Sequence, residues 1–411
     1  MSLKKIVTIL IIIFSISIAT AQEKEDKTLL LRIGDKRLKD KTIDVSPGMI
    51  YSTAEGRPIP FSKMIKEMKS SRFVYVGETH NSLPMHDLQL QIIQALHEQD
   101  RNLSIGLEMF PSASQEVLDK WSLALLDKDE FVRESRWYVN WNYNFGFYEK
   151  IFEFAKNNKI PMCALNAPSE IITKIRRQGW DALSDDEKNI VPQLGLSHEE
   201  HRALIRSIFE ATEIPHQMKG ASLDMAFEGL YRAQSAWDEV MAFNALKAVQ
   251  SSGQKMAVLA GSGHLLYNLG INRRAYEKSR LPFKTVISVV VPEGKSSVQV
   301  ASSLADYICG LKEEEMPAFP SVGLRLKTFQ GLDNLVIESK PVEGVAEKAN
   351  FEKGDIILSV DEQRFLDINE LRIYLARFKW NDEVKFSLLR NAQQIDVILK
   401  FQPPEKKNEQ R

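Results

Sequence analysis

The sequence Phe-Val-Tyr-Val-Gly-Glu-Thr-His occupies residues 73–80, where an apolar run stops abruptly at a glycine and polar side chains. Three further stretches end in the same way, at residues 103–111, 161–168 and 256–264. Near-continuous apolar runs of this length are typical of parallel strands buried on both faces. Helical patterns fill the intervening sequence, so crossover helices should join the strands. The chain therefore predicts an α/β domain with a mainly parallel sheet.

Polar side chains follow each of these runs: Glu78, His80, Glu108, Asn166 and His264. In open parallel sheets, ligands bind beyond the carboxyl ends of the strands. Imidazoles bind transition metals, and carboxylates complete a metal shell or act as bases. We therefore expect these five residues to converge on one acidic, imidazole-rich site.

The composition indicates a globular protein of more than one domain. The chain has 411 residues, which suits two domains plus tails. Apolar residues make up 44% and charged residues 27%, as in globular proteins. The formal net charge of −1 gives no basic footprint for nucleic acid.

The first residues resemble a secretory signal. Lys4 and Lys5 precede an apolar run over residues 6–18, and Ala-Thr-Ala follows at residues 19–21. This order predicts cleavage after Ala21. The run is shorter than the roughly 20 residues that a membrane anchor needs. We therefore expect an exported protein of the periplasm or cell envelope, with no membrane span after cleavage.

Only two cysteines, Cys163 and Cys309, accompany this predicted export. An oxidising compartment permits a disulfide between them. Cys163 lies in a predicted buried strand, so free buried thiols are favoured.

The predicted boundaries follow composition. They are a signal peptide (1–21), a charged and loosely ordered segment (22–45), the α/β domain (46–310), a second domain (321–402) and a tail (403–411). Within the α/β domain, residues 184–222 are expected to form a polar, helix-rich insertion or lid. A long helix is expected over residues 224–251, and a strand over residues 285–291 is expected to close the domain.

The second domain contains Gly-Asp-Ile-Ile-Leu-Ser-Val-Asp at residues 354–361, before a helical pattern over residues 368–378. With the apolar-Gly-apolar turn at residues 322–324, this order resembles a PDZ domain of the bacterial type over residues 321–402.

The PDZ resemblance implies a peptide-binding groove. Its walls would be the strand after Gly323 and the helix carrying Leu371 and Leu375. A partner's terminal carboxylate would bind the backbone N–H groups of Val322, Gly323 and Leu324. The alternative is a PDZ fold that only packs on its neighbour or dimerises.

The polar motifs of the first domain also carry a resemblance. The stretches at residues 77–81, 108–110, 233–239 and 260–264 together resemble the ChaN-like haem-binding uptake family of the Tiki superfamily. The resemblance spans residues 45–295. It implies a three-layer α/β/α fold, haem as cofactor and a haem-bridged homodimer. Some family members are lipoproteins, and this chain has no cysteine near its predicted cleavage site.

Related members of the superfamily are proteases or esterases with Gly-x-x-His motifs. Residues 77–80 and 261–264 correspond to those motifs. This leaves a hydrolase as the alternative function. His80 and His264 would then bind a divalent metal such as zinc or act as bases, and Glu78 or Glu108 would polarise water.

In haem-binding members, the resemblance implies a tyrosine iron ligand with a histidine nearby. Tyr267 follows His264 by three residues, so both could face one pocket. Residues 136–148 contain seven aromatic side chains, which could sandwich a porphyrin or form a core or dimer patch.

Four other histidines have less certain roles in the sequence: His86, His198, His201 and His216. His86 begins the helix after the first motif and either faces the site or caps the helix in partial exposure. His198 and His201 lie three residues apart, and a solvated helix face is favoured over a metal site. His216 lies in the insertion, without an assigned role.

The sequence thus favours an exported haem-binding protein that handles haem or iron at the cell envelope, with a PDZ domain that binds a partner peptide. A third possibility is an inactive scaffold in which only the PDZ domain works.

Overall fold

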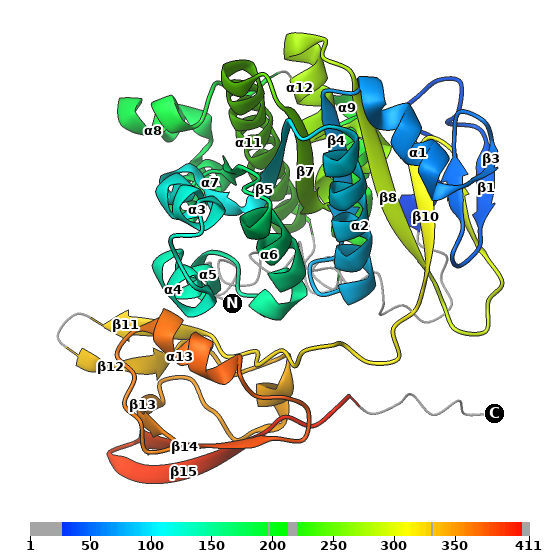
Figure 1. The fold of residues 1–411 in the computed structure, drawn as a ribbon. Coiled ribbons are helices and arrows are strands. Elements are labelled where there is room, and N and C mark those ends of the chain that lie inside the picture. Colours follow the sequence, from blue (N-terminus) through cyan, green and yellow to red (C-terminus); the bar gives the residue numbers. More distant parts are fainter. Residues whose placement is uncertain (1–26, 196–197, 213–219, 330–331, 405–411) are drawn as a thin grey trace. The chain divides into compact units, whose positions relative to one another are not determined.

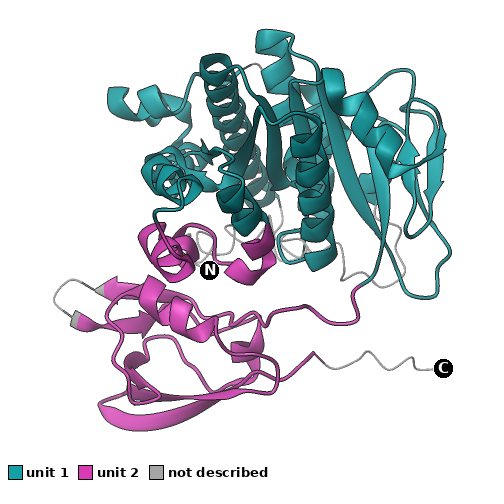
Figure 2. Ribbon diagram, viewed as in Figure 1, with its two compact units in different colours: residues 1–125, 151–313 teal, residues 126–150, 314–411 magenta. Residues whose placement is uncertain are grey.

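The computed structural model describes residues 27–195, 198–212, 220–329 and 332–404 (Figure 1). The predicted signal peptide, His216 and most of the tail lie outside the described residues. The chain divides into two compact units (Figure 2). The α/β unit comprises residues 1–125 and 151–313, and the PDZ unit comprises residues 126–150 and 314–411.

An eight-stranded sheet forms the centre of the α/β unit, in the order β3-β2-β10-β8-β4-β7-β5-β6. Its strands are β2 (Ile50–Ser52), β3 (Arg57–Ile59), β4 (Phe73–Glu78), β5 (Leu103–Pro111), β6 (Met162–Asn166), β7 (Lys255–Gly261), β8 (Phe283–Val291) and β10 (Tyr307–Lys312). The strands from β10 to β6 are parallel neighbours. The predicted parallel sheet is confirmed.

The edge of the sheet differs from the prediction. The strand over residues 285–291 does not close the domain, because β10 follows it in the chain and pairs with it in parallel. Tyr307, Ile308 and Cys309 of β10 are buried. The apolar run of β10 is short and follows a polar loop, so its hydrophobic periodicity was too weak to predict a strand.

Helices cover both faces of this sheet. They are α1 (Phe61–Glu67), α2 (Leu83–Gln99), α3 (Gln115–Ser122), α6 (Glu149–Asn157), α7 (Ser169–Gln178), α8 (Asp185–Ile190), α9 (Glu199–Glu210), α11 (Ala221–Ser252) and α12 (Ile271–Ser279). Helix α2 lies in front of β4 in Figure 1. Helices α9 and α11 share a core with Tyr75, Val258 and Ile287. None of the described helices is long and apolar enough to cross a bilayer.

The N-terminal segment is more ordered than its charge predicts. From residue 27 it forms a 3-10 turn, η3 (Lys27–Leu30), and the strand β1 (Thr42–Val45). Strand β1 pairs antiparallel with β9 (Val298–Ala301). The expectation of a loosely ordered segment is therefore wrong for these residues. Leu29, Ile43 and Val45 are buried, and this apolar contact outweighs the charged composition.

Both cysteine thiols are free, as the sequence favoured. Cys309 is buried in β10, and Cys163 is half-buried in β6. Burial raises the pKa of the Cys309 thiol to about 12, so the reactive thiolate is scarce at neutral pH.

The PDZ unit contains a five-stranded antiparallel sheet in the order β11-β12-β13-β14-β15. Its elements are β11 (Leu326–Phe329), β12 (Leu332–Ile337), β13 (Ile356–Val360), α13 (Ile368–Leu375), β14 (Glu383–Arg390) and β15 (Gln393–Lys400). Leu371 and Leu375 of α13 pack into one apolar core with Leu335, Phe386 and Leu399. Asp367 caps α13, accepting hydrogen bonds from the backbone N–H of Asn369 and Glu370.

Residues 126–150 cluster with the PDZ domain, although their sequence position lies within the α/β domain. They form α4 (Lys128–Glu134), α5 (Trp137–Asn140) and the 3-10 turn η6 (Phe145–Phe147). The two sequence-based domains and the two compact units therefore have different boundaries.

Candidate functional site

The ends of β4, β5 and β7 bring the predicted polar residues together. Glu78 is directly paired with Gly261 across β4 and β7. Glu108 lies in β5, and His264 lies in the 3-10 turn η8 (Ser262–His264), directly after β7. Glu78, His80, Glu108 and His264 are each at most 5% exposed. Their convergence follows from parallel topology, because the carboxyl ends of neighbouring strands meet at one edge.

The first half of the cluster is built around Glu78. His80 Nδ1 lies 2.9 Å from Glu78 Oε1, and Gln89 Nε2 donates to Glu78 Oε2 at 2.7 Å. His86 Nδ1 lies 3.0 Å from Gln89 Oε1 and 3.5 Å from Glu78 Oε2. His86 Nε2 lies 3.2 Å from the His80 carbonyl oxygen. Of the two alternatives for His86, the structure therefore has the buried residue beside the site.

The Glu78 contact fixes the chemistry of the His80 ring. A carboxylate accepts hydrogen bonds, so the proton of this bond belongs to His80 Nδ1. The Nε2 edge of the ring lies against Gly261, where an added Cβ would come within 3.2 Å of Nε2. Glycine at position 261 therefore makes room for this ring. Nε2 is the nitrogen suited to hold a metal or move a proton.

The second half of the cluster is a row of carboxylates and imidazoles. His264 Nε2 lies 3.3 Å from Glu108 Oε1, and His264 Nδ1 lies 2.6 Å from Asp238 Oδ1. Asp238 Oδ2 lies 3.1 Å from His201 Nε2. Glu108 Oε2 accepts a 2.6 Å hydrogen bond from the backbone N–H of Gly261. All of these side chains are buried.

These contacts decide the charge of His264. Burial alone would lower its pKa, but the carboxylates of Glu108 and Asp238 raise the pKa of His264 to about 10. Burial would likewise raise the pKa of Glu108, yet His264, His80 and the Gly261 N–H hold that pKa below its usual value. The two acids therefore favour the imidazolium form of His264 at neutral pH.

Asp238 stabilises this charge from α11. Its burial would raise its pKa, but the close approach of His201 and the charges of His264 and Arg274 hold the pKa well below its usual range. Burial lowers the pKa of His201 despite its contact with Asp238. The row thus joins a neutral His201, an ionised Asp238, a charged His264 and an ionised Glu108.

Asp238 and His201 were not predicted as site residues. The expectation that His201 lies on a solvated helix face is wrong, because the side chain is fully buried. His201, Leu204, Ile205 and Ile208 repeat at helical spacing on the buried face of α9, a stripe visible in the sequence. Asp238 lies on the buried face of α11, and an acid among apolar residues of that helix was the available signal in the sequence.

Two other predicted residues have different partners. The Asn166 side chain donates to the Glu108 carbonyl oxygen at 2.9 Å, so it braces the ends of β5 and β6. Tyr267 donates its hydroxyl to the Thr28 carbonyl oxygen and accepts from the Leu31 N–H. Tyr267 has a φ of 59°, which interrupts the helical turn assumed between it and His264. Its phenol is therefore engaged with the N-terminal segment.

The aromatic run over residues 136–148 lies in the PDZ unit. Five of its seven rings are buried: Trp137, Tyr138, Phe145, Phe147 and Tyr148. The Trp137 ring centroid lies 5.1 Å from that of Phe145 and 5.4 Å from that of Tyr148. These contacts favour the core interpretation over a porphyrin wall.

The predicted peptide-binding turn is tightly packed. Gly323 has a φ of 77°, and an added Cβ would lie 1.9 Å from the Glu343 carbonyl oxygen. The backbone N–H of Ala346 donates to the Val322 carbonyl oxygen at 3.0 Å. Leu324, Leu371 and Leu375 are buried in the core. Strand β11 is terminal in the sheet order, so it presents an edge suited to strand addition.

The donor set favours one imidazole as a metal ligand. His264 is charged and Tyr267 is engaged elsewhere, whereas His80 Nδ1 donates to Glu78. Among the described residues, no three His, Cys, Asp or Glu side chains are arranged to hold a metal ion. The His80 imidazole is therefore the candidate metal ligand of this donor set.

Comparison with known proteins identifies relatives of both domains. The family described as "Haem-binding uptake, Tiki superfamily, ChaN" matches residues 64–275, and a PDZ domain matches residues 321–401. A solved structure described as cofacial haem binding to ChaN of Campylobacter jejuni is 20% identical, with a TM-score of 0.52. It covers 66% of this chain and 96% of that chain, and at this identity the likeness concerns the fold.

Two curated proteins match shorter parts. The protein RETICULATA-RELATED 5, chloroplastic, of Arabidopsis thaliana is 28% identical over 147 residues, or 33% of this chain and 20% of that protein. The probable periplasmic serine endoprotease DegP-like of Rickettsia prowazekii is 31% identical over 72 residues, or 18% of this chain and 14% of that protein. The chain thus spans a fifth or less of the curated relatives it matches.

Proposed function

Since the chain belongs to the ChaN haem-binding uptake family of the Tiki superfamily, we propose that its α/β unit binds haem and that His80 holds the iron. The hydrogen bond between His80 Nδ1 and Glu78 carries this proposal. A metal-bound histidine commonly donates its other N–H to a carboxylate, which orients the ring and raises its basicity. Haem would supply one iron centre that accepts an imidazole ligand.

The other residues of the site support His80. Gln89 and His86 hold Glu78 in place, and Gly261 leaves room beside the imidazole. His264 binds Glu108 and thereby fixes the neighbouring strand end. His80 is only 3% exposed, so the residues that surround its ring would have to move before a ligand could reach Nε2. We therefore expect haem uptake to be slower than diffusion-limited binding.

The proposed role is haem or iron handling at the cell envelope after export. The signal-like residues 1–21 support export. The PDZ domain would bind the C-terminus of a partner along the edge of β11, close to the Gly323 turn. A haem-bridged homodimer is part of the proposal, because the Campylobacter jejuni relative is described with cofacial haem.

A second candidate uses the same pair of residues. With its Nδ1 on Glu78, His80 is oriented as a general base that accepts a proton at Nε2. This hydrolase alternative needs no metal. Glu108 would then be a charged group close to the reacting atoms, because it lies beside the Gly261 backbone and His80.

Haem titration of the mature chain, residues 22–411, tests the proposal. The parent protein is expected to give a Soret band, and His80→Ala to lose or shift it. The matched control is His97→Ala. His97 is buried like His80, but it lies on α2 and contacts Arg101 and Phe154.

A His80→Ala protein that binds haem like the parent would place the iron ligand elsewhere. Ester or peptide hydrolysis that depends on His80, in a protein without a Soret band, would establish the second candidate. Elemental analysis of the same samples separates iron from zinc.

A further inference from the structure

Residues 126–150, called here the docking segment, leave the α/β unit after Leu125 and rejoin it at Ile151. Figure 2 shows them in the colour of the PDZ unit. They contact α13 through charged and polar groups, and Phe319 through apolar ones.

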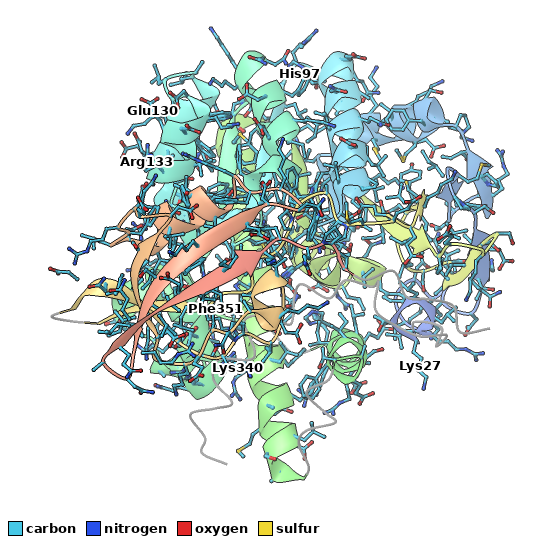
Figure 3. The ribbon with its side chains drawn as sticks, turned by 90° about the horizontal axis from the view of Figure 1, so that it is seen from below. Lys27, His97, Glu130, Arg133, Lys340 and Phe351 are labelled. Carbon is cyan, nitrogen blue, oxygen red and sulfur yellow. The ribbon has the colours of Figure 1, made fainter. Side chains whose placement is uncertain are left out.

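Two arginines of the docking segment pair with acids at the start of α13. Arg133 Nε lies 3.0 Å from Glu370 Oε1, and Arg136 Nη2 lies 3.1 Å from Asp367 Oδ2. Arg133 is labelled in Figure 3. These side chains are about half exposed, so each pair adds little stability alone. Their charge complementarity selects the acidic end of the helix as the contact surface.

Buried polar groups make the contact specific. Asn369 is 1% exposed, and its Oδ1 accepts a 3.2 Å hydrogen bond from the Tyr138 N–H. Arg372 donates to the Tyr138 carbonyl oxygen, and Asn144 Nδ2 donates to the Ala376 carbonyl oxygen at 3.1 Å. Separation would leave several of these groups without their protein partners.

Apolar contacts extend the docking beyond the helix. The ring centroids of Phe147 and Phe319 lie 4.9 Å apart in an edge-on arrangement. An added Cβ at Gly146 would come within 2.4 Å of the Phe319 ring, so glycine permits this close approach. The docking segment therefore also contacts the residues that lead into the PDZ domain.

The contacting face of α13 is distinct from its core face. Leu371 and Leu375 point into the PDZ core. Asn369, Arg372 and Ala376 are rotated away from those leucines along the helix, because successive residues turn by 100°. Helix α13 thus has one face in the PDZ core and another on the docking segment.

We propose that the docking segment is a built-in protein partner of the PDZ domain, which binds the outer face of α13. The PDZ domain is then held by a non-covalent contact as well as by its linker. This inference is independent of haem binding, because it uses no residue of the candidate site.

Cutting the linker tests the contact in the full chain. A protease recognition sequence is inserted between Glu314 and Glu315, ahead of the Phe319 contact. After cleavage, the fragment from residue 315 onward is expected to co-elute with the rest of the protein in size-exclusion chromatography. Separation of the parent fragments at low micromolar concentration would overturn the proposal.

Variants then identify the surface. Arg133→Glu with Arg136→Glu should weaken fragment association roughly tenfold at low salt, since two attractions become repulsions. Asn369→Leu should weaken it by a similar or larger factor, because Tyr138 N–H loses its acceptor. Asp367 stays unchanged in every variant, since it caps α13.

The controls make each outcome decisive. Adding Glu370→Arg to the Arg133→Glu, Arg136→Glu variant restores one opposite-charge pair. This triple variant should recover part of the association that the double variant loses. Lys385→Glu changes an exposed pair with Asp396 and should have no effect. If the cleaved parent co-elutes and the docking variants behave identically, the fragments are held by another surface and the proposal fails.

Discussion

Replacing Asp238 with asparagine removes the carboxylate that His201, His264 and Arg274 surround. The substitution conserves size but leaves the His264 charge with Glu108 as its remaining close acid. Removing one partner of a buried ion pair typically costs about 3–5 kcal/mol. We expect a loss of unfolding free energy of this order at pH 7.

The loss should depend on pH in a defined direction. The pKa of His264 is raised to about 10, against roughly 6.5 in an unfolded chain. Its contribution to stability is therefore complete below about pH 6.5 and disappears as the pH rises through 10. The pKa of Asp238 is lowered, so its contribution is present at neutral and alkaline pH and fades only in strong acid. The cost of Asp238→Asn should therefore be smaller at pH 10.5 than at pH 7.

Urea unfolding of parent and variant at pH 7 and pH 10.5 measures this difference. The difference in unfolding free energy between parent and variant is taken at each pH. Lysines and tyrosines that titrate equally in both proteins then cancel. Asp396→Asn is the control, because its pair with Lys385 is exposed to solvent and should contribute little at either pH. An Asp238→Asn cost that is equal at both pH values would refute the charged-His264 assignment.

Two further predictions concern the PDZ domain and the cysteines. Gly323→Leu should lower the unfolding free energy of the PDZ domain by about 1–3 kcal/mol, because a Cβ would overlap the Glu343 carbonyl. An unchanged thermal unfolding transition would count against this packing. Cys309 should not react with a thiol reagent in the native protein at pH 7.5, since burial raises its pKa to about 12, and it should react fully in denaturant; rapid native labelling, located by mass spectrometry, would contradict its burial.

The strand pattern predicted much of the α/β fold because buried parallel strands leave a local signal. Residues 73–80 and 256–264 end in glycine and polar groups, and their strands are neighbours in the sheet. The convergence of Glu78, His80, Glu108 and His264 follows from that topology alone.

Other parts of the site depend on contacts that no local pattern encodes. His201 reaches Asp238 from a separate helix, and the left-handed φ of Tyr267 cancels an argument based on helical spacing. The aromatic run was equally compatible with a cofactor wall and a core. Its ring contacts and its hydrogen bond to α13, more than 200 residues away in sequence, favour the core.

The docking segment also has a consequence during synthesis. Arg136 and its partner Asp367 are 231 residues apart. At about 5–20 residues per second, a ribosome needs roughly 10–50 s to make the intervening chain. During that interval, the Tyr138 N–H and carbonyl oxygen have no Asn369 or Arg372 to bind. Water must therefore satisfy these backbone groups until α13 has been made.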